Sequence, residues 1–421
     1  MFNSKIIKLS VVALIITLVL VLTIFPLLNW WTSENFNGSG YGLNNKFGTV
    51  NTIVPLNNVS KSTDFKLFSL MSQVKFSFIK PPSLNKITRT SAGIISKSNN
   101  NMKNIILFPG QGDYILTQNN SQVWPINIQN IDNNESATVY ANNKGHFNTV
   151  TTLLENLNYK EGDKLNTITY DFRNINFQEI IKQFKQFING DTVIIAYDFG
   201  AVIANICINI LQKMKDNINH SKISKLLLIC PTIGGVSMTL RDYFSGNNVV
   251  NPSIIQNYHS VLLSMPNKQL YDDLPIAIYN SISYNAKDIH VLMDYENKPS
   301  KLFKELQYYQ HLSIENSHIN TIIITNDQYN TPVSYNFRNN LKQSPEKYNG
   351  VNNNQIPLTD IHNNGKVEGL QANGDGVVPI SVINKLYEKW GPNCKIELIK
   401  DKDHFTILKS YELALIIMAN L

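Results

Sequence analysis

Residues 192–214 read TVIIAYDFGAVIANICINILQKM, and this stretch decides the fold. Its first part, Thr192–Tyr197, predicts a buried strand, and its last part, Ala201–Met214, predicts an apolar helix. A strand, a sharp turn and a helix form the nucleophile elbow of serine hydrolases, with the nucleophile at the tip. The tip here is Asp198, so the pentapeptide AYDFG differs from G-x-S-x-G at two of its three marked positions. Taken alone, the stretch equally fits an ordinary turn in which Asp198 caps the helix.

Short apolar runs on both sides of this stretch alternate with helical patterns. They predict strands at Ile105–Phe108, Leu165–Tyr170, Leu226–Cys230, Ile322–Thr325 and Ile396–Ile399, and helices over Phe147–Leu157 and Phe177–Ile188. Such an alternation predicts a mostly parallel sheet with helices on both faces. Residues 236–310 break the pattern and predict an inserted cap or lid. Residues 326–370 are rich in asparagine and read as loop.

Two later segments supply further polar groups in a characteristic order. Asp375 lies in a Gly-Asp-Gly turn before a helix, and His404 follows the last predicted strand. As isolated features they indicate a turn and a surface histidine. Together with Asp198 they give the order nucleophile position, acid, histidine, which is the order of α/β-hydrolase triads. We therefore predict an α/β-hydrolase fold with an inserted cap.

The oxyanion hole of this fold needs backbone N–H groups from two places. Phe199, the residue after the elbow tip, supplies the first. The loop after the first predicted strand, Pro109-Gly110-Gln111-Gly112, supplies the second, with glycines that let its amides turn towards the site. We predict Gln111 and Phe199 as the two donors.

Several short motifs, in order, make residues 104–415 resemble the lecithin:cholesterol acyltransferase family of phospholipases and lipid acyltransferases. The matching segments are Phe108-Pro109-Gly110, Tyr170-Asp171-Phe172-Arg173, Pro231-Thr232-Ile233-Gly234-Gly235, Gly374-Asp375-Gly376 with Val378-Pro379, and His404 with Ile407 and Leu408. The resemblance implies that Asp375 and His404 are the triad acid and base and that residues 236–310 cover an acyl chain. It also suggests substrate contact for Arg173, for which a salt bridge at a strand end is the alternative.

The aspartate departs from that family at the attacking residue. Attack of Asp198 on an acyl ester would form a mixed anhydride, and a carboxylate near neutral pH has no proton for His404 to remove. Three functions stay open. The chain is an enzyme of ester-lipid metabolism with altered activity, a catalytically dead lipid-binding protein, or a hydrolase with an aspartate nucleophile like those that open epoxides.

The N-terminus predicts the location of the protein. Lys5 and Lys8 precede an apolar run from Val11 to Leu28, of a length near the minimum for crossing a bilayer, and Trp30 and Trp31 follow it. We predict an uncleaved signal anchor over residues 1–31 and a single-pass membrane protein with a lumenal or extracellular catalytic domain, secreted if the segment is cleaved. N-glycosylation sequons at Asn37, Asn58, Asn119, Asn134 and Asn219 agree with that placement.

Composition narrows the remaining possibilities. Residues 32–100 are polar and predict a stalk or an irregular extension, and residues 101–421 predict the hydrolase domain. The net charge of +6 comes from scattered lysines without a basic run, which argues against nucleic acid and allows weak attraction to an anionic membrane surface without requiring it. The expected lipid or membrane-surface substrate is what the family resemblance implies. Three cysteines give no disulfide framework and no metal pair, and Cys207 and Cys230 read as buried hydrophobes. We expect no cofactor and no metal.

Overall fold

The structure is a computed structural model of the chain. It describes residues 102–113, 115–118, 121–124, 138–140, 145–245, 255–294, 300–339, 358–360, 362–363, 366–367 and 369–421. The predicted anchor (1–31) and stalk (32–100) lie outside these residues. The predicted membrane location is corrected, because none of the helices in the described ranges is both long and apolar enough to cross a bilayer.

A six-stranded sheet forms the centre of the fold, and every neighbouring pair of its strands is parallel. Its members are β1 (Asn104–Phe108), β5 (Leu165–Thr167), β6 (Thr192–Tyr197), β7 (Ile223–Ile229), β10 (Thr321–Thr325) and β17 (Cys394–Leu398). They lie in the order β17-β10-β7-β6-β1-β5. The central strands β1 and β6 are buried throughout, as their unbroken apolar sequences require.

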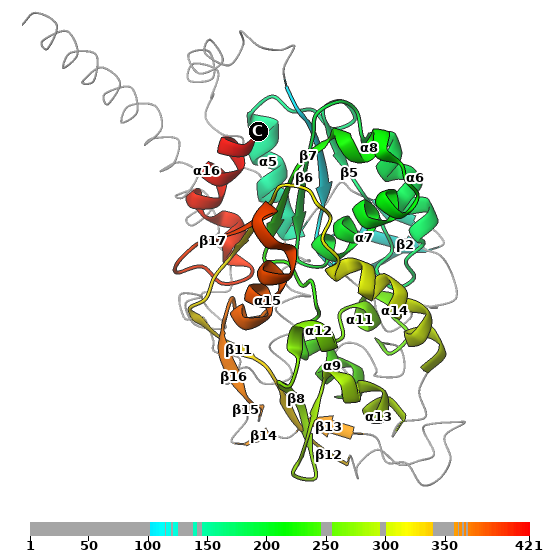
Figure 1. Ribbon diagram of the computed structural model, residues 1–421, viewed down its shortest axis with the longest axis vertical. Coiled ribbons are helices and arrows are strands. Elements are labelled where there is room, and N and C mark those ends of the chain that lie inside the picture. The colour runs from blue at the N-terminus through cyan, green and yellow to red at the C-terminus, as the bar shows by residue number, and fades with distance from the viewer. Residues whose placement is uncertain are drawn as a thin grey trace, which may run out of the picture. The chain divides into compact units, whose positions relative to one another are not determined.

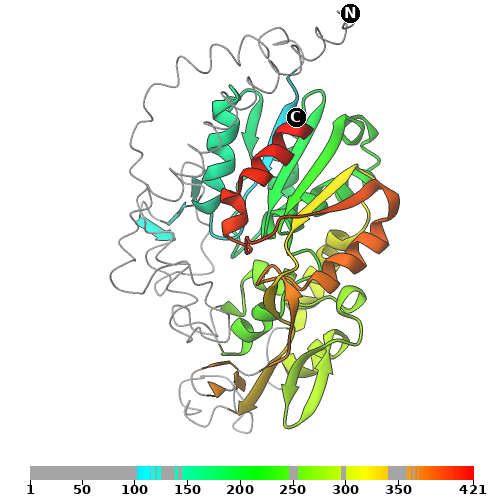
Figure 2. The ribbon, with the colours of Figure 1, turned by 90° about the vertical axis from the view of Figure 1, so that its left-hand side faces the viewer.

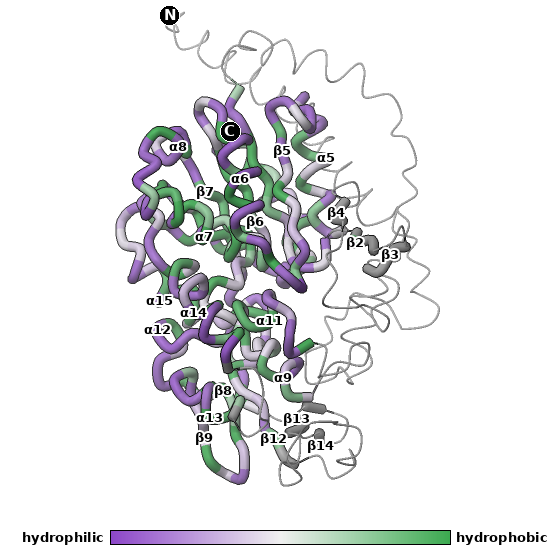
Figure 3. The backbone as a smooth tube through the Cα atoms, turned by 90° about the vertical axis from the view of Figure 1, so that its right-hand side faces the viewer, coloured by the Kyte–Doolittle hydropathy of each residue, from purple (hydrophilic) through white to green (hydrophobic). Residues whose placement is uncertain are grey.

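Helices cover both faces of this sheet (Figure 1). Helix α5 (Asn148–Asn156) lies on one side, and α6 (Phe177–Phe187), α7 (Phe199–Lys213) and α8 (Asn217–Lys222) lie on the other. Helix α7 is buried along most of its length, and both α7 and the strands beside it are strongly hydrophobic (Figure 3). The predicted strand–turn–helix over residues 192–214 is therefore confirmed. The sheet order, the elbow position and the two helical layers are those of an α/β-hydrolase fold.

Side-chain amides hold α7 against α14 (Ser300–Ile314). Asn205 and Asn209 each donate to carbonyl groups at the end of that helix, at distances of 2.6–3.1 Å. Gln212 donates to Ser317 O just beyond it. The last carbonyl groups of a helix have no intrahelical partner, so these amides satisfy them from the neighbouring helix. This contact places the C-terminal end of the cap segment on the sheet domain.

The cap lies beyond one end of the sheet (Figures 1 and 2). Its helices are α9 (Ser237–Ser245), α11 (His259–Leu263), α12 (Lys268–Tyr271), η7 (Ala286–Asp288) and α13 (Ile289–Asp294). A small sheet in the order β13-β12-β8-β9 completes it, with strands at Leu358–Asp360, Tyr335–Asn339, Pro275–Tyr279 and Ile282–Asn285. This confirms an inserted cap.

The cap is built from two insertions, which corrects the interpretation of residues 326–370 as loop. Strand β12 comes from this second insertion and pairs with β8 of the first. A two-stranded ribbon of β11 (Tyr329–Pro332) and β16 (Gln371–Gly374) then returns the chain to the sheet domain. The asparagine-rich composition concealed these strands because each is short and gains stability only from its partner.

Further elements complete the described ranges. They are β2 (Ile115–Gln118), β3 (Ser121–Trp124), β4 (Thr138–Tyr140), η6 (Gly145–Phe147), β14 (His362–Asn363), β15 (Lys366–Val367), α15 (Ile380–Trp390), η9 (Gly391–Asn393), η10 (Thr406–Lys409) and α16 (Tyr411–Asn420). The sheet, the cap and the site belong to the compact unit that contains Lys103–Leu408. Most of α16 belongs to a second unit.

Candidate active site

The elbow holds Asp198 in an unusual backbone conformation. Its φ of 51° and ψ of −126° are rare for a residue with a side chain, and such strain persists only where the surrounding structure enforces it. Gly200 lets the turn pack closely against the adjacent strand β1, because a Cβ at this position would overlap the carbonyl oxygen of Phe108. The tight turn leaves the Asp198 side chain partly exposed, at 16%.

His404 lies between two carboxylates, those of Asp375 and Asp198. Its Nδ1 is 2.9 Å from Asp375 Oδ2, and its Nε2 is 3.4 Å from Asp198 Oδ1. The imidazole and the Asp375 side chain are almost fully buried. The structure thus brings together all three residues that the sequence order suggested. Their roles as nucleophile, acid and base stay predictions.

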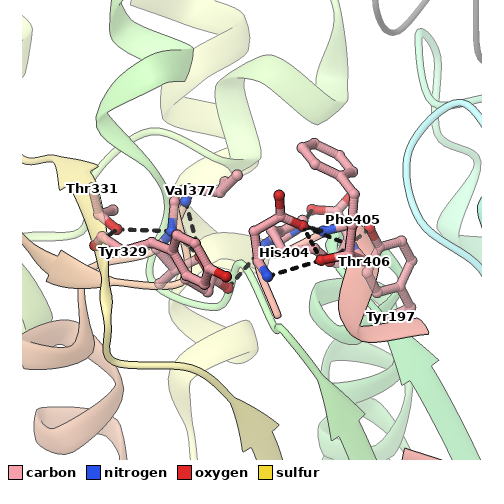
Figure 4. Close-up of polar contacts among 12 residues, drawn as sticks. Tyr197, Tyr329, Thr331, Val377, His404, Phe405 and Thr406 are labelled. Atoms are coloured by element: carbon pink, nitrogen blue, oxygen red, sulfur yellow. Dashed lines mark hydrogen bonds and ion pairs between the residues drawn. The ribbon is translucent and has the colours of Figure 1, made fainter. Parts of the chain in front are cut away.

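Asp375 is held by the turn that follows β16. Its Oδ1 accepts hydrogen bonds from the N–H groups of Val377 and Val378, at 2.8 and 2.7 Å. The neighbouring Gly376 N–H donates to Thr331 Oγ1 on the ribbon (Figure 4). The backbone N–H of His404 also donates to the backbone oxygen of Asp375, at 2.8 Å. These bonds fix the acid and the histidine relative to each other.

The predicted oxyanion loop reaches Asp198 itself. Gln111 N–H donates to Asp198 Oδ2 at 3.1 Å. Phe199 N–H is the first amide of α7, where helix geometry provides no intrahelical acceptor. The Gln111 amide therefore lies at the elbow, where its acceptor is the Asp198 carboxylate. The roles of Gln111 and Phe199 as oxyanion donors stay predictions.

Asp113 is a buried carboxylate that the sequence analysis missed, although it ends the Pro-Gly-Gln-Gly-Asp segment. Its Oδ2 accepts from Gly110 N–H and its Oδ1 from His146 N–H, both at 3.0 Å. Asp113 thus ties the oxyanion loop to the segment before α5. It also engages the Gly110 amide, while the Gln111 amide points at Asp198. Burial, followed by the charge of Asp198, raises the pKa of Asp113 above its usual value, and the backbone N–H donors oppose that shift.

The charges around His404 determine its protonation. Burial alone would lower the pKa of the imidazole, but Asp375 and Asp198 outweigh it and raise the pKa to about 10. Burial likewise would raise the pKa of Asp375, and the charge and hydrogen bond of His404 lower it overall. At neutral pH the site therefore holds an imidazolium between two carboxylates.

Aromatic rings surround the His404 loop. Tyr197, directly before Asp198, donates from its hydroxyl to His404 O at 3.2 Å and packs against the imidazole ring. On its other side Tyr197 stacks on Phe147 with ring centroids 6.0 Å apart. Phe405 lies edge-on to His404 (Figure 4). Sequence patterns offered no signal for the contact between Tyr197 and His404, because these two residues are 207 positions apart.

Arg173 lies buried beside Asp171. Its Nε and Nη2 donate to the two oxygens of that carboxylate at 2.9 and 2.6 Å. The salt bridge that the sequence left as an alternative is therefore present. A substrate contact for Arg173 stays a prediction.

One group of side chains near the site has metal-ligand chemistry. The ligand atoms of Cys230, Asp375 and His404 lie within 4.8 Å of one another. Burial and the nearby carboxylates raise the pKa of the Cys230 thiol, which disfavours the thiolate that a metal needs. Asp375 and His404 also already bond to each other. Cys207, Cys230 and Cys394 are all buried free thiols, as expected for the first two.

Comparisons with known proteins give little beyond this geometry. The chain matches no protein-family model and no curated protein. A similar solved structure is that of the Tle4–Tli4 complex, with 10% identity, a TM-score of 0.35 and coverage of 65% of this chain. The match spans 66% of that chain, slightly less than two thirds. At this level the likeness carries no information on function.

Proposed function

We propose that this chain is a hydrolase of the α/β-hydrolase fold that acts on lipid-like substrates with Asp198 as its nucleophile. One observation carries the proposal. The two oxygens of Asp198 have different partners, because Oδ2 accepts Gln111 N–H while Oδ1 faces His404 Nε2. An aspartate nucleophile needs this division, with one oxygen to attack and one held by an oxyanion donor.

In the first step Asp198 Oδ1 attacks a saturated carbon that carries an oxygen leaving group, such as an epoxide carbon. The new bond joins Oδ1 to that carbon, and the carbon–oxygen bond of the substrate breaks. The departing oxygen takes the proton of His404 Nε2. The raised pKa of His404 supports this step, since the resting imidazolium already holds the proton that the leaving group requires.

In the second step water hydrolyses the alkyl ester on Asp198. His404, now neutral, takes a proton from water, and the hydroxide attacks Cγ of Asp198. The charge develops on Oδ2, where Gln111 N–H already donates. Collapse then breaks the bond between Cγ and the alkyl oxygen, and the departing alkoxide takes the proton of the added hydroxyl. The products are the alcohol, the Asp198 carboxylate and the imidazolium. Asp375 orients His404 through Nδ1 in both steps.

The same geometry argues against ordinary acyl transfer to Asp198. The product would be a mixed anhydride, and the Gln111 amide that would bind the substrate carbonyl is engaged by the elbow carboxylate. The lipid-like substrate class comes from the resemblance described above, and aromatic residues such as Phe199 and Phe405 around the site are compatible with it.

A lipid-binding protein without turnover is the second candidate. The ion pair between His404 and Asp198 favours it, because that pair neutralises the residue that a serine enzyme would use as base. In this case the scaffold of an ester-lipid enzyme survives without its nucleophile.

Trapping of the covalent intermediate tests the proposal. The purified full chain and its His404→Gln variant would be incubated with a long-chain epoxide and, separately, with a phospholipid ester. The proposal expects His404→Gln to form the adduct slowly, because the opened oxygen must then take its proton from water, and to retain it, because no base activates water for its hydrolysis. The adduct has the mass of the epoxide and lies on the peptide that contains Asp198, and Asp198→Asn shows none. An unmodified His404→Gln chain and no turnover by the native chain would contradict it. Ester hydrolysis by Asp198→Ser alone would then support the second candidate, and ester hydrolysis by the native chain would restore the ester-lipid enzyme.

A further inference from the structure

We propose that Arg173 and Tyr258 form a subsite for an oxyanion, a carboxylate or phosphate group on an amphiphilic substrate. The inference rests on the proposed function in one respect, because it takes this anionic group to be part of the substrate that reacts with Asp198. It concerns two hydrogen-bond donors that the described part of the chain leaves without acceptors.

Arg173 has one unused end of its guanidinium. The residue is 3% exposed, and Asp171 engages Nε and Nη2. Nη1 is buried and has no hydrogen-bond partner among the described residues. A buried donor of a cationic group without an acceptor is costly, so such a group calls for a ligand or water.

Tyr258 supplies a second unused donor. It is 4% exposed, and its hydroxyl has no partner within the described ranges. Burial raises its pKa to about 12, and the charge of Arg173 opposes that shift, so the phenol stays protonated at neutral pH. The Ser260 hydroxyl, two residues further on, is also buried without a partner.

Backbone bonds clamp the two segments together. His259 N–H donates to Arg173 O at 2.9 Å, and Ser260 N–H donates to Phe172 O at 3.0 Å. The ring of Tyr258 meets the ring of Phe172 edge-on at 5.9 Å. The start of cap helix α11 is therefore docked on the segment after β5, which places the unused donors on adjoining pieces of chain.

The chemistry of these donors selects the ligand. A guanidinium nitrogen and a phenol both donate, so they match a group that only accepts, and a guanidinium adds charge complementarity to a carboxylate or phosphate. The same segment also reaches the elbow, because Tyr170 donates to Pro109 O at 2.9 Å and packs on Phe199. A substrate bound at Asp198 can thus carry its anionic group towards Arg173.

Binding of simple amphiphiles to the full chain tests this subsite without turnover. Isothermal titration would compare decanoate and decyl phosphate with decanol and decylamine, which share the alkyl chain. The variant is Tyr258→Phe, and Tyr159→Phe is the matched control. Tyr159 is also a buried tyrosine, at 6% exposure, but it precedes β5 in the chain, whereas Arg173 follows that strand, so Tyr159 lies towards the other end of β5.

The subsite predicts that the native chain prefers one or both anions to decanol and decylamine. Tyr258→Phe weakens anion binding about tenfold, leaves decanol binding unchanged and does not lower the melting temperature, because it removes an unsatisfied hydroxyl. Arg173→Lys, which keeps the charge and loses the planar fork, also weakens anion binding. The better of the two anions identifies carboxylate or phosphate as the natural group.

Two results would overturn the subsite. One is equal affinity of the native chain for anions and decanol. The other is anion binding by Tyr258→Phe that matches the Tyr159→Phe control, which would leave water as the partner of these donors. If the chain binds anions through Tyr258 but forms no adduct on Asp198, the subsite stands and the proposed hydrolase function fails. If the chain forms the adduct but binds anions no better than decanol, the hydrolase function stands and the subsite fails.

Discussion

The turn Gly374–Val378 and the elbow Tyr197–Gly200 each present one carboxylate to His404, but they hold it differently. Asp375 is fully buried, lies 2.9 Å from the imidazole and accepts two backbone N–H bonds on its other oxygen. Asp198 is partly exposed, lies 3.4 Å away and accepts one oxyanion-loop amide. Both oxygens of Asp375 therefore have partners in a buried site, whereas the Asp198 carboxylate is partly exposed and can contact a substrate. One histidine with two unequal carboxylates therefore has a supporting side and a reacting side.

The largest effect should come from the supporting side. Asp375→Asn cannot accept the Nδ1–H bond as the carboxylate does, so His404 loses its orientation and its charge stabilisation. We expect turnover of the lipid-like substrate to fall about 10⁴-fold, as in serine triads with this change. Steady-state kinetics with circular dichroism as the folding control would check it. A loss of less than tenfold would contradict the distinction between Asp375 as the supporting carboxylate and Asp198 as the reacting one.

The oxyanion loop gives the next largest effect. Gln111→Pro removes the N–H that donates to Asp198 Oδ2, and we expect turnover to fall about 100-fold or more. Gln111→Ala keeps the backbone amide and should stay within about twofold of the native rate. Equal losses in the two variants would show that the side chain, and not the amide, matters.

Gly200→Ala tests how closely the elbow packs on the sheet. The added Cβ would overlap Phe108 O, so the elbow must shift from the strained conformation of Asp198. We expect a loss of about 2–3 kcal/mol in the free energy of unfolding. Urea denaturation would measure it. A Cβ at Gly162 would meet no atom within 4 Å, so Gly162→Ala costs only the strain of the positive φ at that position and should destabilise the chain less.

The pH dependence separates the two carboxylates. The pKa of His404 lies near 10 in the folded chain and near 6.5 when unperturbed, so its contribution to stability is complete below pH 6.5 and disappears as the pH rises through 10. Asp198→Asn should lower this pKa, while Asp375 keeps it above 6.5. Melting temperatures between pH 6 and 10 would follow the change. An identical profile for the variant would mean that Asp198 contributes no charge to His404.

The smallest effect concerns the support of the turn itself. Thr331→Val removes the hydroxyl that accepts Gly376 N–H at 2.9 Å. We expect a loss of about 1 kcal/mol in stability and a modest fall in turnover, since the Val377 and Val378 amides still hold Asp375. The same denaturation and kinetic assays apply. A loss as large as that of Asp375→Asn would place Thr331 in the reacting group.

Much of the fold could be predicted from sequence because it depends on local patterns. The strands at 192–197 and 322–325 and the helix after Asp198 are long apolar runs with clear ends, and the structure confirms them. Strand β12 was not predicted, since a five-residue strand with two aromatic side chains gives a weak local pattern and gains its stability beside its partner β8. Asp113 escaped notice because a carboxylate after a glycine-rich loop reads as a turn residue until its distant donor, His146 N–H, is known.

By itself, the sequence determined the α/β class, the elbow and the chain order of Asp198, Asp375 and His404, because hydrophobic periodicity and turn residues act over a few neighbouring positions. Only the tertiary structure decided which oxygen of Asp198 meets Gln111 and which meets His404, that two insertions build one cap, and that Arg173 and Tyr258 lie together. These features depend on contacts between segments far apart in the chain, whose distances and directions are set by packing and not by local pattern.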